Sequence, residues 1–406
     1  MPRVAREPRA AHHPSMSTPI HFRHIDLACG GRILSDRHVL VANGVVTTVS
    51  PTPIESPSAA LVVDGPGILA QGFVDTHTHG RSGFDVMRPG DVALLSLDLL
   101  SQGVTGFLPT VVAAPPIDLL AALASVQGDP GGARILGIHA EGPFLSPDQP
   151  GMFPPDAFRD YDPALWCDMQ ATAAAPIRLM TVAAERLTPS QIDALHADAV
   201  TLSLGHTNAT YEQASAAFDA GITRVTHAYN AMPGFHHRAP GAVGALLVRG
   251  EIDAELILDG LHVSRAAARL LATTRTAGRV VLVSDSVPPA ACPPGDYTWA
   301  ARHLRVLGDS IRLPTGRLAG SALTLDDAVR RAVAWLGVDP AVALFMASEA
   351  PRASIGLDPD GLRTGAVADL VLLDLHLHPR MTLVGGVVRW RWTGPKHCAI
   401  APSGAD

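Results

Sequence analysis

The chain has 406 residues, of which 47% are hydrophobic and 17% charged, and its formal net charge is −7. A chain of this length can bury a core in one large domain, or in a large domain with a small companion. The negative balance without any basic stripe argues against a nucleic-acid surface, and no apolar run reaches the ~18 residues of a membrane-spanning helix. Four scattered cysteines without a C-x-x-C pair argue against a zinc knuckle or a disulfide framework and favour the reducing cytoplasm.

Both ends of the chain differ from its middle. Residues 1–19 have no apolar segment, so we expect a disordered tail rather than a signal peptide, with Met16 as an alternative start to Met1. Short β-like runs between Gly and Pro turns occupy residues 20–70, and similar runs return in residues 366–406. Two β-rich ends around a different middle predict that both termini build one small sheet domain.

Residues 71–365 alternate short apolar runs with Ala- and Leu-rich stretches of helical character. Eight strand–helix units are the number that a (β/α)8 barrel of the TIM type requires, and a doubly wound open sheet is the alternative. No G-x-G-x-x-G or G-x-x-x-x-G-K loop follows an early strand, which weakens the open-sheet reading. The predicted strands are 72–78, 104–110, 134–140, 178–183, 200–206, 223–229, 254–259 and 280–285.

Ionisable side chains lie at the ends of six of these strands, where barrels of this kind carry their chemistry. A lone strand-end histidine is more often a hydrogen-bonded structural residue, and the H-x-H pair in DTHTHG (75–80) is a weak signal by itself. Because all of these groups fall at one end of successive strands, we interpret them as one shared metal site. They are His77, His79, Glu141, His206, His227, His262 and Asp285.

Imidazoles and a carboxylate without thiolates fit zinc or another first-row divalent ion with an open position for water. Such an ion lowers the pKa of water toward ~7 and polarises a carbonyl. A carboxylate beside the ion can accept the proton that the water must lose and pass it to a leaving amine. Asp285 is the candidate for this role.

The same residues lie in motifs that resemble the N-acetylglucosamine-6-phosphate deacetylase family of the amidohydrolase superfamily. The combination of HAEGPF, THAYNAMP and DGLHV is highly specific, whereas H-x-H names only the superfamily. The resemblance covers residues 72–357 and implies a metal-dependent barrel, residues 71–365, with a small β-sandwich built from 20–70 and 366–406. The motifs are GFVDTHTHG, HAEGPFLSP, LGHTNAT, THAYNAMPGFHHRAPG, DGLHV, LVSDS, LAGSALTLDDAVR and SEAPRASIGL.

The resemblance implies a divalent metal, with zinc preferred, bound as one or two ions. Asp285 matches the family's general acid/base. Some members lack the H-x-H pair and use one metal, so the pair here favours a two-metal site. The implied ligands are Glu141, His206 and His227 for one ion, and His77 with His79 for a second.

The resemblance also implies an amino-sugar phosphate as substrate and a homodimer, with no nucleic-acid or membrane partner. The matching substrate-binding positions are Asn230, Ala231 (through its backbone N–H), Arg238 and His262, and they bind the sugar phosphate partly across the dimer interface.

The lysine content excludes one kind of two-metal site that occurs in the superfamily. Dihydroorotase-like and urease-like relatives bridge two metals with a carbamylated lysine. Lys396, near the C-terminus, is the only lysine of this chain, so the predicted barrel cannot use that bridge. Glu141 must therefore take the strand-3 ligand position.

One departure concerns the lid that follows HAEGPF. The family commonly carries a basic K-K-G-x-H segment there, whose histidine helps to polarise the amide carbonyl. Here the segment reads LSPDQPGMFPP, with Gln149, Pro150 and Phe153 at those positions. Either the second metal or a group such as His236 or His237 covers this role, or the substrate differs.

The sequence therefore predicts a cytoplasmic metal-dependent deacetylase that converts N-acetylglucosamine 6-phosphate to glucosamine 6-phosphate and acetate. One alternative is an amidohydrolase that acts on a different N-acyl amino sugar or another amide lacking the phosphate, which the lid supports. A catalytically dead barrel used as a scaffold is the alternative of another class. A scaffold should have lost ligands, whereas every implied metal position and Asp285 are present.

Overall fold

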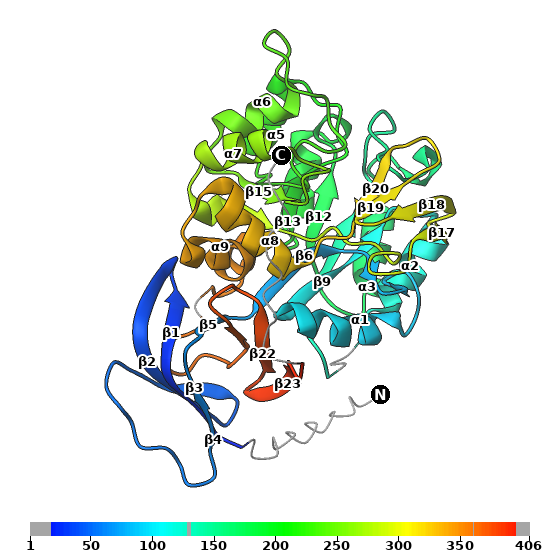
Figure 1. Cartoon of the computed structure of the whole chain (residues 1–406). Helices are drawn as coiled ribbons and strands as arrows, with labels where there is room; N and C mark the ends of the chain where they lie inside the picture. The colour runs from blue at the N-terminus through cyan, green and yellow to red at the C-terminus, as the bar shows by residue number, and fades with distance from the viewer. Residues whose placement is uncertain (1–17, 128–130, 360, 395–406) are drawn as a thin grey trace, which may run out of the picture.

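The computed structural model describes residues 18–127, 131–359 and 361–394. The predictions on residues 1–17 and the positions of Lys396 and Cys398 lie outside these ranges. Figure 1 shows a helix-covered barrel, and beside it a sheet in which strands from the blue N-terminal end lie next to strands from the red C-terminal end. No helix within the described ranges is long and apolar enough to cross a membrane.

Eight parallel strands form the barrel, and they pair in the order in which they occur along the chain. The last strand is joined to the first by backbone hydrogen bonds: Asp285 N–H donates to His77 O (2.9 Å), and His79 N–H donates to Ser286 O (2.8 Å). This closure confirms the predicted barrel and excludes the open sheet. The strands are β6 (Phe73–Thr78), β9 (Val104–Val112), β11 (Ile138–Glu141), β12 (Ile177–Val182), β13 (Thr201–Leu204), β14 (Arg224–Val225), β15 (Asp253–Leu256) and β16 (Val280–Leu282).

The predicted strand 134–140 is interrupted. Its first part, β10 (Arg134–Ile135), pairs with β9 on its own, and β11 begins only at Ile138. Gly137 separates them at φ 145°, where a Cβ would lie 2.8 Å from the carbonyl oxygen of Pro176. The chain therefore bends at the one residue that tolerates both the angle and the contact.

Helices cover the outside of the barrel, and one follows each barrel strand. Local signals set their starts: Thr188 and Thr210 form capping boxes with Gln191 and Gln213, which satisfies the first free N–H groups of two helices. The helices are α1 (Asp91–Leu99), α2 (Pro116–Ser125), α3 (Pro163–Thr172), α4 (Pro189–His196), α5 (Tyr211–Asp219), α6 (Gly241–Val248), α7 (Arg265–Thr273), α8 (Leu325–Arg331), α9 (Pro340–Ala347) and α10 (Glu349–Ser354).

Both termini contribute to one sheet of eight strands, in the order β23-β22-β21-β5-β1-β2-β3 with β4 beside β1. Alternate side chains such as Phe22, Val39 and Leu383 are fully buried in its own apolar core. The domain boundaries at residues 70 and 366 stay a prediction. The strands are β1 (Ile20–Cys29), β2 (Arg32–Ala42), β3 (Val45–Ser50), β4 (Leu61–Asp64), β5 (Ile68–Gln71), β21 (Leu370–Leu373), β22 (Pro379–Val384) and β23 (Val387–Arg391).

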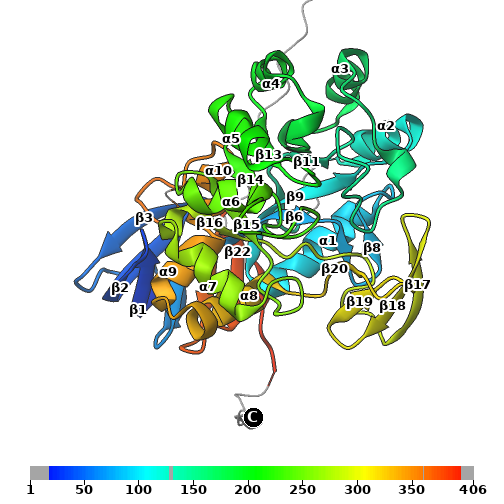
Figure 2. The ribbon, with the colours of Figure 1, turned by 90° about the horizontal axis from the view of Figure 1, so that it is seen from above.

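A four-stranded antiparallel sheet that the sequence did not predict is inserted between β16 and α8. Figure 2 shows its yellow strands on the side of the barrel opposite β1 and β2. Its apolar residue Trp299 packs in one cluster with Met152 and Phe153 of the lid, so the insert and the lid build one wall of the barrel mouth. The strands are β17 (Gly295–Trp299), β18 (Arg302–Leu307), β19 (Ser310–Arg312) and β20 (Leu318–Ser321), and a smaller ribbon pairs β7 (Gly80–Arg81) with β8 (Phe84–Asp85).

Candidate functional site

The predicted site residues come together at the C-terminal mouth of the barrel. Three of them lie in the turns after their strands with positive φ angles, +44° at His206, +29° at His227 and +46° at Asp285. Such angles cost on the order of 1–3 kcal/mol at non-glycine residues and cluster at functional sites. His77 lies within β6 and Glu141 ends β11, whereas His79 follows the last residue of β6.

One triangle of ligand atoms is formed by His206, His227 and Glu141. The two Nε2 atoms lie 3.1 Å apart, and each is 3.2 Å from Oε1 of Glu141. A tetrahedral zinc ion with bonds of ~2.0–2.1 Å places its ligand atoms roughly 3.3 Å from one another. The three residues, all at most 4% exposed, therefore have the spacing of one metal site.

A second group shares Glu141 with the first. Nε2 of His77 and Nε2 of His79 lie 3.2 Å apart, and Oε2 of Glu141 is 3.3 Å from His79. Oδ1 of Asp285 is 3.4 Å from His77 and 3.3 Å from His79. Oε2 of Glu141 is buried and, within the described part of the chain, accepts no hydrogen bond. This group fits a second ion, with Glu141 between the two positions.

Hydrogen bonds on the outer ring nitrogens fix how two of the histidines face the centre. Nδ1 of His79 lies 3.1 Å from the carbonyl oxygen of Thr110, and Nδ1 of His206 lies 2.9 Å from that of Gln149. A carbonyl can only accept, so both Nδ1 atoms carry the proton and both Nε2 atoms present a lone pair inward. That is the tautomer in which a histidine binds a metal.

Buried carboxylates bring negative charge to the centre. Burial lowers the pKa of His77, but Asp285, Glu255 and Glu141 outweigh it and raise the pKa to about 10. Burial raises the pKa of Glu141 and Asp285, yet the surrounding histidines hold both pKa values below the usual range. Both carboxylates are therefore ionised at neutral pH, and a divalent cation would balance their charge.

A buried pair behind the ligands was missed by the sequence reading. Arg224, fully buried, donates to Oε1 of Glu255 from Nη2 (2.8 Å) and Nε (3.1 Å). Oε2 of Glu255 lies 2.9 Å from Nδ1 of His77 and accepts the backbone N–H of His227 at 3.0 Å. Glu255 thus orients ligands from two strands. Its only signal in the sequence is a charge inside an apolar strand, which is rare unless the charge is paired.

Asp75 has a similar supporting role at the barrel seam. Its carboxylate accepts the hydroxyl of Ser284 at 2.5 Å and the backbone N–H of Ser284 at 3.2 Å. Burial raises its pKa to about 6, although these hydrogen bonds oppose the rise. Because Asp75 and Ser284 precede His77 and Asp285, this contact sets the two site residues against each other.

A cavity of about 460 Å³ opens directly above the ligands. Asn230, Ala231 and His262 line it, and Nδ1 of His262 lies 2.6 Å from Oδ2 of Asp259. Arg238 does not line the cavity; it lies exposed on the loop after β14. Three of the four predicted substrate-binding residues therefore reach the cavity within one chain, and Arg238 does not.

The lid segment contributes backbone rather than basic side chains. Besides the carbonyl of Gln149, the carbonyl of Gly151 accepts a hydrogen bond from Nη1 of Arg317 at 2.7 Å. A Cβ at Gly151 would lie 2.8 Å from Cε1 of His206, so the lid rests directly on a ligand. Phe153 supplies an aromatic wall, with its ring 5.8 Å from His206.

Arg312 and Arg317 are cavity residues that sequence reasoning did not find. Both belong to the inserted sheet or its turn, in the stretch RLPTGR, which has no ligand pattern of its own. Only the folding of the insert over the barrel mouth brings their guanidinium groups to the cavity. No signal in the sequence could have placed them there.

We expect Glu255→Gln to weaken metal binding about 10- to 100-fold, as loss of a partner behind a metal ligand typically does. The amide keeps the size of the side chain but removes the charge that pairs with Arg224 and orients His77. Competition with a chelator measures the affinity. Glu251→Gln, the same change at an exposed glutamate, is the control, and equal affinity in both variants would contradict the orienting role.

Comparisons with known proteins agree with this geometry. The sequence model described as Amidohydrolase family matches residues 68–389. An N-acetylgalactosamine-6-phosphate deacetylase of Escherichia coli O157:H7 is 36% identical, covering 87% of this chain and 94% of that protein. The N-acetylglucosamine-6-phosphate deacetylase of Bacillus subtilis is 30% identical, covering 91% and 97%.

Solved structures show the same fold. A mutant N-acetyl-D-glucosamine-6-phosphate deacetylase from Mycobacterium smegmatis, in complex with N-acetyl-D-glucosamine-6-phosphate, superposes with a TM-score of 0.84 at 29% identity, covering 92% of this chain and 100% of that one. The N-acetylglucosamine-6-phosphate deacetylase from Thermotoga maritima gives a TM-score of 0.83 at 29% identity with the same coverage.

Proposed function

Because the chain belongs to the amidohydrolase family, we propose that it hydrolyses N-acetylglucosamine 6-phosphate to glucosamine 6-phosphate and acetate. The observation that carries this proposal is the convergence of four imidazole Nε2 atoms and Glu141 beside Asp285, at the floor of a cavity of substrate size. Relatives named for this reaction, 30–36% identical over most of the chain, support it.

The proposed metal is zinc. Glu141, His206 and His227 would hold one ion, and His77 with His79 would hold a second that shares Glu141. Bound there, a divalent ion lowers the pKa of water toward ~7 and polarises a carbonyl. The nitrogen and oxygen ligands without sulfur, and the ligand spacing of 3.1–3.2 Å, support this assignment.

Asp285 is the proposed proton carrier. Its carboxylate is ionised at neutral pH and faces both the ligand nitrogens and the cavity. It accepts the proton of the attacking water as the new C–O bond forms at the acetamide carbonyl. It then delivers that proton to the nitrogen as the C–N bond breaks. The second proton of the water leaves the new carboxyl group for the amine, so that acetate and the ammonium form of the sugar are released.

The phosphate group is proposed to meet Asn230, the backbone N–H of Ala231 and His262, together with Arg312 and Arg317 from the inserted sheet. The two guanidinium groups would supply the positive charge that the lid lacks, and a planar guanidinium suits a phosphate group.

The proposed assembly is a cytoplasmic homodimer, in which the exposed Arg238 of one chain completes the phosphate site of the other. Phe235, 59% exposed on the same loop, supports this as a contact surface.

The experiment that tests the function compares kcat/KM for the 6-phosphate and for unphosphorylated N-acetylglucosamine. Each hydrogen bond to a charged group contributes about 1.5–3 kcal/mol, so we expect the phosphorylated sugar to be preferred at least about 100-fold. Equal values would instead support an amidohydrolase of unphosphorylated amides.

The E. coli relative favours a second candidate, the epimeric N-acetylgalactosamine 6-phosphate. The same assay with that sugar decides between them: the substrate with the higher kcat/KM is the one that the cavity selects.

We expect Arg317→Ala to raise KM for the phosphorylated sugar about 10-fold or more, since a charge-assisted contact of about 1.5–3 kcal/mol is removed. Because Arg317 also holds the lid through Gly151, turnover of the unphosphorylated sugar is measured in parallel. Arg305→Ala on the outside of the same sheet is the control. A KM unchanged by Arg317→Ala, or raised equally for both sugars, would contradict phosphate recognition by this residue.

A further inference from the structure

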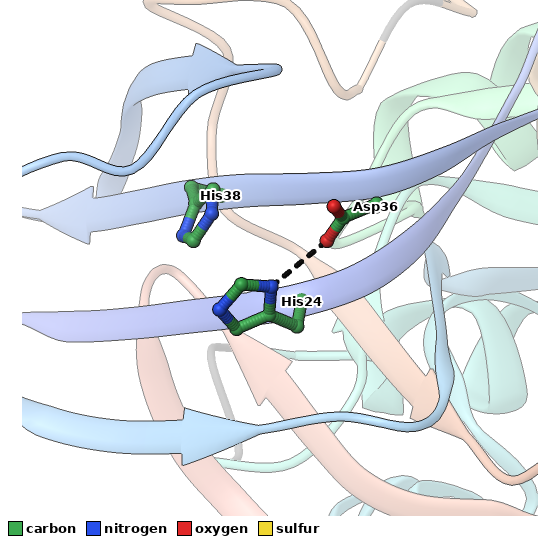
Figure 3. Close-up of side chains that lie close together, drawn as sticks. All are labelled: His24, Asp36 and His38. Carbon is green, nitrogen blue, oxygen red and sulfur yellow. Dashed lines mark hydrogen bonds and ion pairs between the residues drawn. The ribbon is translucent and has the colours of Figure 1, made fainter.

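A separate group of side chains that could hold a metal ion lies on the terminal sheet, far from the barrel mouth. Figure 3 shows His24 of β1 facing Asp36 and His38 of β2. One ligand atom from each residue lies within 4.8 Å of those of the other two. None of the three lines the cavity above the barrel ligands.

Irregular pairing of the two strands brings these side chains together. The antiparallel register between β1 and β2 shifts between Phe22 and Ile25, so His24 departs from the regular alternation of sides. Its Nδ1 lies 2.9 Å from Oδ1 of Asp36, and its ring meets that of His38 edge-on with centroids 4.7 Å apart. Asp36 is itself held through its backbone N–H, which donates to Oδ1 of Asp26 at 3.2 Å.

One buried nitrogen atom of His38 has no hydrogen-bond partner within the described residues. The atom is Nδ1, and the residue is 2% exposed. The adjacent His21 is fully buried, with its ring centroid 5.8 Å from that of His38, and its Nε2 is likewise unpartnered within the described ranges. Buried polar atoms without partners cost free energy, and each requires an explanation.

The cluster is also accessible from one side. The side chains of His24 and Asp36 are 63% and 69% exposed, whereas His38 forms the buried base. Two imidazoles and one carboxylate without a thiolate suit zinc and its first-row neighbours, with water in the remaining positions. We propose that His24, Asp36 and His38 form a separate site for a first-row divalent cation, which links β1 to β2.

The number of bound ions tests this proposal on the full chain. Wild type and the double variant His24→Asn, Asp36→Asn are dialysed to equilibrium against excess Zn²⁺, and the metal per chain is measured by mass spectrometry. We expect the double variant to bind one ion fewer than wild type, with kcat/KM changed less than about twofold because the cluster is remote from the cavity. His12 and His13 are the same in both proteins, so any binding by them cancels.

A matched control separates the site from general binding by surface histidines. His303→Asn changes an exposed histidine of β18 and should keep the wild-type number of ions. A rise in the unfolding temperature with Zn²⁺, beyond that of the double variant, is the second expected result, since the ion would cross-link two strands. Equal ion numbers in wild type and the double variant, or the same loss in His303→Asn, would overturn the proposal.

Discussion

Asp285→Asn is expected to lower kcat for deacetylation by about 10²–10⁴-fold while the chain keeps its bound metal. The amide has the shape of the carboxylate but cannot accept the proton of water or return it to the amine. In the structure, Oδ1 of Asp285 is 3.3–3.4 Å from the Nε2 atoms of His79 and His77, the place where a proton carrier would act. Steady-state kinetics and metal analysis on the same preparation measure the two effects.

Asp296→Asn, at an exposed aspartate of the inserted sheet, is the control for that result and should behave as wild type. Turnover of the Asp285 variant near the wild-type rate would refute the proton-carrier role. Loss of metal together with activity would instead make Asp285 a ligand of the second ion, which its distances to His77 and His79 also allow.

Glu141→Gln is expected to give the second large effect, loss of both bound metal and activity. The single carboxylate faces all four ligand histidines, so its removal affects both metal positions. Loss of a residue that only orients a metal ligand already lowers metal affinity by about 10–100-fold. Loss of the ligand itself should therefore lower the affinity by more than about 100-fold. Metal per chain and the rate of acetate release are measured before and after dialysis.

Glu212→Gln, an exposed glutamate of α5, is the matched control for Glu141. His77→Asn refines the comparison, because His77 belongs to the group with His79 and is not one of the three residues of the His206–His227–Glu141 triangle. That variant should keep the ion held by His206 and His227. If Glu141→Gln retained the full metal content and turnover, the shared position of this carboxylate would be wrong.

The fold and the convergence of the candidate ligands could be predicted because they depend on local pattern. Eight apolar runs followed by helical stretches specify the barrel, and the barrel itself sends the ends of parallel strands to one mouth. His77, Glu141 and Asp285 therefore needed no long-range information beyond their positions at strand ends. Their mutual distances then follow from the barrel closing between β16 and β6.

The supporting residues could not be predicted because their partners are remote in the sequence. Arg224 and Glu255 can be recognised only as a pair across the neighbouring strands β14 and β15. Glu255 also reaches His77 of β6, which lies beyond the intervening strand β16. Arg317 reaches the cavity only because the inserted sheet packs on the lid. Arg238 is the opposite case, a residue with a sequence signal that does not reach the cavity. Its motif predicts a position near the substrate, but within one chain it lies exposed.

The structure gives the lid a supporting role that its side chains do not indicate. The side chains of Gln149 and Phe153 lack the charge of the family's basic lid. In the structure the carbonyl of Gln149 holds His206, and that of Gly151 holds Arg317. The lid therefore supports the site through backbone atoms, which a change of side chain leaves in place.

Reconstitution of the metal-free chain tests directly whether deacetylation depends on metal bound at the barrel mouth. The chain is stripped with a chelator and titrated with Zn²⁺, while glucosamine 6-phosphate formation from N-acetylglucosamine 6-phosphate is followed. We expect no turnover without metal and a rate that rises as ions fill the site of Glu141, His206 and His227 and the second site of His77 and His79. Full turnover by the stripped chain, or none at metal saturation, would contradict it.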